Sequence, residues 1–338
     1  MANLNVALVG CGRMGQRYLQ ALVHCSEVDL IATADSDPEK AAAAAVPFDA
    51  ASYSDMDSLL AAQRNLDGVI IATPSSTHRQ LAVEALTRGL NVLVERPMAL
   101  TGEDARVMIR VAAEQSRILA VTQVNRLLPT VSEALDVFRQ GRLGRLIEGG
   151  VSVRWARSQA YYDSSPWRLT EGGVLFNQAI AALDVLLQFS GRIKEVFAYT
   201  ATLTHQLDCE DTVVGVLRAE DGALLTLNAT TSAFDSDLEE RLVVLGESGS
   251  IVLGPAMQQV EFWRVRGDDE DQIKEGVNGR PARPSWQTHL DAINDFQLTV
   301  AGNKPARLSG ESALHVVEVL EALAYSAQTG QPVRVDHR

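Results

Sequence analysis

Cysteine, aromatic residues and long apolar runs are all scarce in this sequence. Of the 338 residues three are cysteines, Cys11, Cys25 and Cys209, and they are widely spaced with no C-x-x-C pair. An odd, scattered set of thiols excludes a disulfide framework and favours a reducing compartment. The apolar runs fall far short of a membrane span, and the first strand begins almost at the N-terminus, so we expect no signal peptide. We therefore expect a cytoplasmic protein.

Positive charge is also in short supply. The chain has 30 Lys and Arg against 43 Asp and Glu, a net charge of −13. This balance argues against nucleic-acid and anionic-membrane partners. No histidine pair or cysteine cluster has the spacing of metal ligands, so no metal is expected. We expect the acidic run 268–271 to be a solvated loop. The 46% hydrophobic content is ample for two domains.

A glycine-rich turn near the N-terminus organises the rest of the chain. The apolar run Val6–Val9 predicts a buried strand, and a helix is predicted over 14–23. Between them, Gly10, Gly12 and Gly15 have G-x-G-x-x-G spacing. The first glycine permits a tight turn, the second lets a pyrophosphate approach the backbone, and the third lets helix and strand pack closely. The helix N-terminus would then hold the phosphates.

An acidic residue refines this prediction. Asp35 follows the second apolar run, Leu30–Ala34, and can accept hydrogen bonds from both ribose hydroxyls of NAD. It would repel the 2′-phosphate of NADP, and the next residue is Ser36, not an arginine. NAD is therefore the expected cofactor. Asp37, before Pro38, is expected to act as a helix N-cap.

Strands and helices alternate through the first part of the chain. Further strands are predicted at 68–72, 91–94 and 118–122, with helices from 38 and at 56–62, 78–88 and 101–115. Asp55 is expected to cap one helix and Thr101 another, and Thr77 and Gln80 have capping-box spacing. The alternation predicts a Rossmann doubly wound parallel sheet, an α/β domain over 1–124 that binds ligands at the carboxyl ends of its strands.

A different pattern begins near residue 125. Strands are predicted from 146, and then in succession from 195 to 266, with His205 on the first of this series. They indicate an α+β domain over 125–338 with a mostly antiparallel open sheet. Its late helices, 285–300 and 311–327, can pack back on the first domain. The segment 223–232 does not form a strongly charged face, so we expect a homodimer or homotetramer joined through this domain.

Several motifs occur together along the chain: the glycine turn, Ala72–Pro74 followed by His78, Leu90–Met98, Gln123–Arg126, Gly172–Gly173, and Asn177–Ile180 leading to Asp184. Together they resemble the Gfo/Idh/MocA family of NAD(P)-dependent oxidoreductases over nearly the whole chain. The stretch 157–168 is similar to members that oxidise nucleotide-linked amino-sugar uronates.

Taken together, the glycine turn and the resemblance give a set of residues expected to bind NAD. They are Gly10, Gly12, Arg13, Met14, Gly15, Asp35, Thr73, Pro74, His78, Glu95, Arg96, Pro97, Asn125, Trp167 and Arg168.

The chain departs from the family pattern where protons are handled. Arg96 stands in place of the family lysine, Ala181 in place of its histidine, and Asn177 in place of its aspartate. Alcohol oxidation needs a base with a pKa near the working pH. Arginine cannot serve, because its pKa stays at roughly 12.5 or above, but its guanidinium can bind a carboxylate, phosphate or developing oxyanion. The loop 167–173 also looks shorter than in sugar-oxidising relatives.

Other side chains could supply the missing chemistry. Tyr161 or Tyr162 could act as an acid or simply pack, and His205 could face the pocket or solvent. Asp184 could bind substrate or satisfy a buried partner. The candidate catalytic residues are therefore Arg96, Asn177, Asp184, Tyr162 and His205.

Three functions compete on this evidence. The first is an NAD-dependent oxidoreductase with altered proton transfer, acting on a sugar-like or other small anionic substrate. It would reduce an activated C=O, C=N or C=C bond, or oxidise a sugar-like substrate with a substitute base. The second is a catalytically silent NAD-binding protein that regulates or scaffolds a partner. The third is non-redox sugar chemistry with tightly held NAD. We favour the first.

Overall fold

A computed structural model of the chain describes residues 3–281, 283–302, 304 and 306–335. Two compact units emerge. The first comprises Met1–Val124 and Pro284–Leu314, and the second comprises Asn125–Arg283 and His315–Arg338. Each is described by itself.

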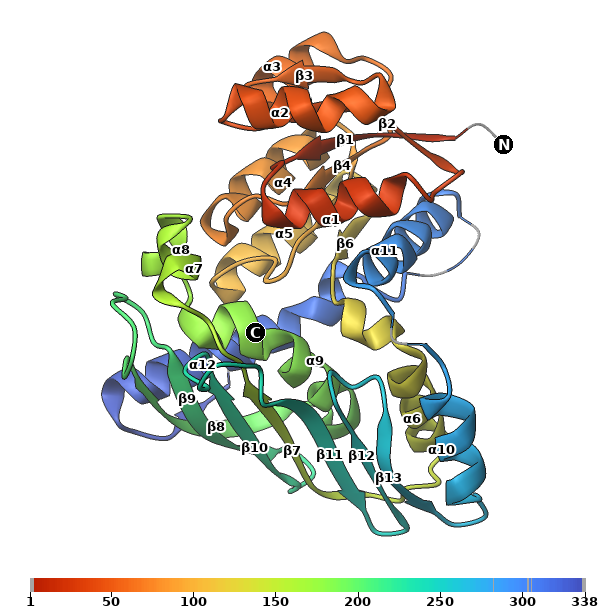
Figure 1. The fold of residues 1–338 in the computed structure, drawn as a ribbon, viewed down its shortest axis with the longest axis vertical. Coiled ribbons are helices and arrows are strands. Elements are labelled where there is room, and N and C mark those ends of the chain that lie inside the picture. The colour runs from red at the N-terminus through yellow and green to blue at the C-terminus, as the bar shows by residue number, and fades with distance from the viewer. Residues whose placement is uncertain (1–2, 282, 303, 305, 336–338) are drawn as a thin grey trace. The chain divides into compact units, whose positions relative to one another are not determined.

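The first unit is built on a six-stranded sheet with the order β3-β2-β1-β4-β5-β6, in which every neighbouring pair is parallel (Figure 1). The strands are β1 (Leu4–Val9), β2 (Val28–Ala34), β3 (Ala51–Tyr53), β4 (Gly68–Ile71), β5 (Asn91–Val94) and β6 (Leu119–Val121). The helices are α1 (Arg13–Leu22), α2 (Pro38–Ala45), α3 (Met56–Ala62), α4 (His78–Thr87), α5 (Gly102–Glu114) and α11 (Ser285–Val300), with short 3₁₀ turns at Val46–Phe48 and Ser75–Thr77. The predicted doubly wound sheet is confirmed.

Three of the four predicted helix caps are present. Asp37, Asp55 and Thr101 each accept main-chain N–H groups at the start of α2, α3 and α5. The capping box at Thr77 is wrong. A 3₁₀ turn precedes α4 and gives Thr77 a helical backbone, so its hydroxyl donates to the Pro74 carbonyl at 2.7 Å and caps no N–H group.

Helix α11 comes late in the sequence but belongs to the first unit. It packs beside α1, and Ile293 and Phe296 join Tyr18 and Leu22 in one buried apolar cluster. Figure 1 shows this blue helix next to the red α1. This packing places His289 of α11 beside Glu95, the residue that directly follows β5.

The second unit is an eight-stranded sheet with the order β13-β12-β11-β7-β10-β9-β8-β14. Its strands are β7 (Leu146–Arg154), β8 (Ile193–Ala201), β9 (Thr212–Ala219), β10 (Leu224–Thr230), β11 (Glu239–Gly246), β12 (Gly249–Leu253), β13 (Val260–Val265) and β14 (Val333–Arg334). Only β7 and β10 pair in parallel among these described strands. The mostly antiparallel α+β prediction is confirmed.

Several helices accompany this sheet. They are α6 (Pro129–Arg139), α7 (Gln159–Asp163), α8 (Trp167–Thr170), α9 (Ile180–Ser190), α10 (Glu270–Asn278) and α12 (Gly310–Thr329), with a 3₁₀ turn at Val124–Leu127 and a π-helical turn at Leu175–Ala179. Helix α9 packs on β7 and β11 and is buried almost throughout.

Two predictions fail in this unit. Strand β8 ends at Ala201, so His205 lies in the loop before β9 and not on a strand. The acidic run 268–271 is not a simple solvated loop, because Asp269 caps helix α10 and Asp268 accepts the Trp263 indole N–H at 2.8 Å. Within the described part of the chain, no helix has the length and apolar character that crossing a membrane requires.

Candidate active site

The glycine turn has the geometry that its spacing predicts. Gly10 has φ +94°, and a Cβ there would lie 2.6 Å from the Ala72 carbonyl carbon. A Cβ on Gly15 would lie 2.2 Å from the Gly10 oxygen, so helix and turn can approach only without side chains. Gly12 differs, because a Cβ there would meet no described atom within 4 Å. Gly12 is also the N-cap of α1 and supplies no side-chain cap. This open, positively polarised helix start fits a pyrophosphate.

Asp35 ties the end of β2 to this turn. Its Oδ2 accepts the Cys11 N–H at 2.7 Å and its Oδ1 accepts the Asp37 N–H at 2.9 Å. Each carboxylate oxygen has a second lone pair, so both can still accept a ribose hydroxyl. Burial, together with the Asp35 charge, raises the pKa of the Cys11 thiol to about 12, so this cysteine serves as a small core residue.

His78 holds the loop that follows β4. This histidine is 1% exposed, with Nδ1 2.8 Å from the Pro97 oxygen and Nε2 2.9 Å from the Thr73 oxygen. The ring therefore joins the loop after β4 to the loop after β5. Within the predicted cofactor site, these contacts hold the main chain at Thr73 and Pro97.

The loop after β5 carries Glu95, Arg96 and Pro97, with a cis peptide bond between the last two. Glu95 and Pro97 are buried, whereas Arg96 is partly exposed. Burial would raise the pKa of the Glu95 carboxyl, but hydrogen bonds from His289 and Tyr18 and the Arg96 charge outweigh it and leave the pKa lowered. Sequence reasoning missed Tyr18 and His289, because neither lies in a motif.

Asp184 lies in α9 and is bound by Arg126 of the Gln123–Arg126 segment. Arg126 donates from Nε at 2.6 Å and from Nη2 at 2.5 Å to its two carboxylate oxygens. The sequence leaves two roles open for Asp184, substrate binding and pairing with a buried group, and the structure shows Arg126 as a buried partner. Ala181, one turn earlier, is 9% exposed and offers only a methyl group.

The turn that precedes α9 holds Asn177. Its Nδ2 donates to the Glu171 oxygen at 2.9 Å, and the residue lies in the π-helical turn. Such turns are frequent at functional sites. The backbone before it favours glycine, because Gly172 and Gly173 have φ +71° and +49°, in the left-handed region.

Tyr162 is a buried phenol in the second unit. It is 4% exposed, its hydroxyl is 2.6 Å from Thr231 Oγ1, and desolvation raises its pKa to about 12. Its ring lies 4.9 Å from the His205 ring. These contacts support a packing role for Tyr162 over a role in acid catalysis.

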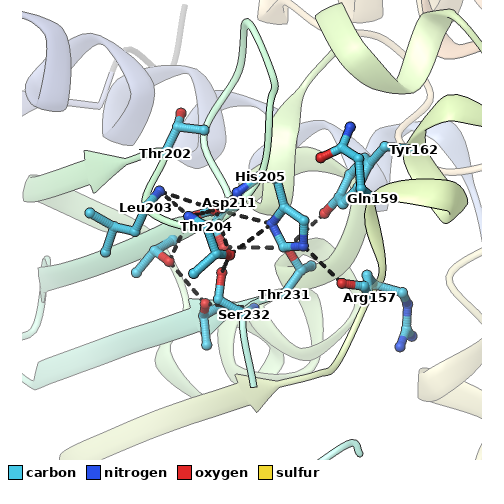
Figure 2. A network of polar contacts seen from close by, with 12 residues as sticks. Arg157, Gln159, Tyr162, Thr202, Leu203, Thr204, His205, Asp211, Thr231 and Ser232 are labelled. Atoms are coloured by element: carbon cyan, nitrogen blue, oxygen red, sulfur yellow. Dashed lines mark hydrogen bonds and ion pairs between the residues drawn. The ribbon is translucent and has the colours of Figure 1, made fainter. Parts of the chain in front are cut away.

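His205 belongs to a polar network centred on Asp211 (Figure 2). Asp211 is fully buried, and its carboxylate accepts the main-chain N–H groups of Leu203, Thr204 and His205. His205 Nδ1 lies 3.0 Å from Asp211 Oδ2, and Nε2 lies 2.8 Å from the Arg157 oxygen. Both ring nitrogens are therefore engaged in contacts within this network. This ring anchors the loop.

Three other residues predicted to bind the cofactor also lie in the second unit. Asn125 donates to Glu240 Oε1 at 3.2 Å. Arg168 lies 4.6 Å from the Tyr161 ring centre and 5.3 Å from that of Trp167, and its Nη1 donates to Ser164 Oγ at 2.7 Å. Its buried Nε has no hydrogen-bond partner among the described residues. Their role toward NAD stays a prediction.

The described residues contain no group of His, Cys, Asp or Glu arranged to hold a metal ion.

Comparison with known proteins gives consistent matches. The model for the "Oxidoreductase family, NAD-binding Rossmann fold" (GFO_IDH_MocA) matches residues 4–123, and that for the "GFO/IDH/MocA C-terminal domain" matches 131–252. Inositol 2-dehydrogenase 2 of Saccharopolyspora erythraea is 26% identical, over 98% of this chain and 96% of its own. UDP-N-acetylglucosamine 3-dehydrogenase of Acidithiobacillus ferrooxidans is 31% identical over 56% of each. The WlbA dehydrogenase from Bordetella pertussis, solved with NADH and UDP-GlcNAcA, has a TM-score of 0.93 and 30% identity, covering 100% of this chain and 99% of that one.

Proposed function

The chain belongs to the GFO/IDH/MocA family of NAD-dependent oxidoreductases, and on that premise we propose that it acts on an anionic, sugar-like substrate with weakened proton transfer. The observation that carries the proposal is Arg96, a partly exposed guanidinium between the buried Glu95 and Pro97. An obligate cation suits an anionic substrate or a developing oxyanion and cannot act as a base. UDP-GlcNAcA, the ligand of the WlbA structure, supports this substrate class.

The residues of the first unit fit the cofactor. Gly12 and the start of α1 would hold the pyrophosphate, and Asp35 would accept the ribose hydroxyls. When bound, the reduced cofactor supplies a hydride. Arg96 would donate hydrogen bonds to the substrate oxygen as the carbon of a C=O group gains that hydride, and water would deliver the proton that completes the hydroxyl.

Reduction suits this set of residues better than oxidation. The other candidate proton carriers are engaged elsewhere, because Asp184 is bound by Arg126, His205 by Asp211, and Tyr162 by Thr231. Alcohol oxidation needs a base that removes the hydroxyl proton, whereas a reduction needs only a proton from solvent.

The test begins with the nucleotide carried by the purified protein, identified by mass spectrometry. NADH absorbance is then followed with keto forms of nucleotide-linked amino-sugar uronates and with neutral keto sugars. We expect faster NADH consumption with the anionic ketones, and Arg96→Ala should remove that preference. Tight NAD with no turnover would indicate the silent binding protein. Product without an absorbance change would indicate the non-redox alternative.

The outer face of the second sheet supports a homo-oligomer. Tyr199, Val214, Val216 and Leu224 are all more than half exposed on this face, and Tyr199 pairs with Val214 across β8 and β9. We propose that a second copy covers this apolar patch. Sedimentation should show a dimer or tetramer, and Val214→Glu with Val216→Glu should dissociate it, whereas Val23→Glu, on an exposed valine of the first unit, should not. A monomer at micromolar concentration would contradict this.

The charge and the thiols suggest where the protein works. We infer a cytoplasmic protein without a nucleic-acid partner, because the net charge is −13 and all three cysteines are free.

A further inference from the structure

Glu95, directly before Arg96, is the centre of a buried cluster drawn from distant parts of the first unit. It is 5% exposed. Its Oε2 accepts the Arg96 N–H at 3.1 Å, and its Oε1 lies 3.0 Å from the Tyr18 hydroxyl and 3.3 Å from His289 Nε2. Tyr18 comes from α1 and His289 from α11. The carboxylate therefore links two helices to the main chain at Arg96.

The second ring nitrogen of His289 is also engaged. Nδ1 lies 2.9 Å from the Ser285 oxygen, which can only accept a hydrogen bond. Since Nε2 faces a carboxylate, it can donate to Glu95 only when it carries a proton. The ring is 2% exposed and meets the Tyr18 ring edge-on, with centres 5.0 Å apart. Its position is thus fixed by three contacts.

Tyr18 connects the cluster to the next strand. Its hydroxyl lies 2.6 Å from Thr122 Oγ1, which in turn donates to the Val94 oxygen at 3.0 Å. Val94 is the last residue of β5, and Thr122 directly follows β6. The charged and titratable groups that face Glu95 are therefore Tyr18 from α1, His289 from α11 and Arg96 from its own loop.

We propose that His289 is a positioning residue for the reaction: its ring holds the Glu95 carboxylate and thereby fixes the main chain from which the Arg96 side chain extends. This inference rests on the proposed role of Arg96. Without the His289 ring, the buried carboxylate would lose a hydrogen-bond donor and either take up a proton or shift toward water. Either change would weaken or break its hydrogen bond from the Arg96 N–H. The guanidinium would then be placed less accurately, and a misplacement of about 1 Å can cost about 100-fold in rate.

Two variants of His289 separate its roles. His289→Phe keeps a ring against Tyr18 but removes both ring nitrogens, whereas His289→Gln can still donate to Glu95. We expect kcat for NADH-dependent reduction to fall about 10- to 100-fold in His289→Phe, with KM for NADH within about twofold, and to recover in large part in His289→Gln. His24→Phe is the matched control, because His24 stacks on Trp286 of the same helix α11 with ring centres 4.4 Å apart and lies outside the cluster.

The pH profile gives a readout that a purely structural role would not move. In the unmodified protein the lowered pKa of Glu95 keeps its carboxyl ionised. Protonation of this group therefore causes no decline of kcat near neutral pH. In His289→Phe the hydrogen bond from His289 no longer offsets burial, so the pKa of Glu95 should rise and kcat should decline as the pH is lowered toward about 5. An equal kcat and an unchanged profile in His289→Phe would overturn the proposal.

A spectroscopic test does not depend on turnover. Histidine labelled with ¹⁵N should show a proton on His289 Nε2, the nitrogen that faces Glu95, assigned by its loss in His289→Phe. A ring without a proton on Nε2 would overturn the proposal. If the unmodified protein fails to reduce any substrate, the proposed function fails while this signal still decides the state of the Glu95–His289 pair.

Discussion

Arg126 holds both carboxylate oxygens of Asp184, at 2.6 and 2.5 Å. The two side chains are only 7% and 2% exposed. Breaking a buried ion pair leaves one charge without compensation, which costs far more than an exposed pair contributes. Asp184 thus stabilises the second unit by fixing α9 to the segment that begins it.

The first prediction concerns stability. Asp184→Asn is expected to lower the free energy of unfolding by about 3–5 kcal/mol, because the Arg126 charge stays buried. Glu133→Gln is the control. It breaks an exposed pair with Arg280 at 2.9 Å, and such pairs contribute about 0–1 kcal/mol. Urea unfolding measures both. Full stability of Asp184→Asn together with loss of kcat would show instead that Asp184 acts on substrate.

The second prediction concerns the cofactor. NAD should bind more tightly than NADP, because the Asp35 carboxylate would face the 2′-phosphate. Asp35→Ala should reduce the ratio of the two affinities roughly tenfold, or about 1.4 kcal/mol. It should also weaken both cofactors, because the Cys11 N–H loses its acceptor. Asp37→Ala, which removes only the α2 cap, should leave the ratio unchanged. Isothermal titration decides, and equal affinities in the unmodified protein would refute the assignment.

The glycine turn and Asp35 were predictable because their signal is local. A strand, a turn and a helix follow one another within 20 residues, and each glycine has its own steric reason. His289 was not predictable, because its partner Glu95 is 194 residues away and nothing in the 285–300 pattern distinguishes it from a core residue. Only the packing of α11 against α1 brings the two together.

His205 was misplaced for a related reason. The alternation after residue 195 continues through Thr204, but the Asp211 carboxylate collects the N–H groups of residues 203–205 and bends the chain out of the sheet. A side chain that competes for main-chain hydrogen bonds leaves little trace in the hydrophobic pattern.

The third prediction is a pH dependence of stability. Hydrogen bonds from the loop outweigh desolvation and lower the pKa of Asp211 below its ordinary 3.8. Because the pKa of Asp211 is lower in the folded protein than in the unfolded chain, its ionised carboxylate stabilises the fold above the unfolded pKa. This contribution to the free energy of unfolding is lost as the pH falls below that value. Asp211→Asn should cost about 1–3 kcal/mol at neutral pH and flatten the loss of stability between about pH 4 and 2. The control Asp208→Asn, in the same loop but exposed, should follow the unmodified curve. Parallel curves for Asp211→Asn and the unmodified protein would refute this.

The central claim is that Arg96 and Ala181 mark the loss of the family proton relay. Restoring it with Arg96→Lys and Ala181→His should raise alcohol oxidation, since general acid–base catalysis contributes about 10²–10⁴-fold. Ala181→His alone is the control, because a larger side chain at a buried position can disturb α9. His205→Asn should leave the pH profile of the unmodified protein unchanged.

The most direct measurement is the steady-state rate of sugar-alcohol oxidation by the unmodified protein across pH, followed through NADH absorbance beside the double variant. We predict slow oxidation at neutral pH without a single titration near pH 7, and a clear gain in the double variant. Brisk oxidation by the unmodified protein with one titration near pH 7 would contradict the claim and reveal another base.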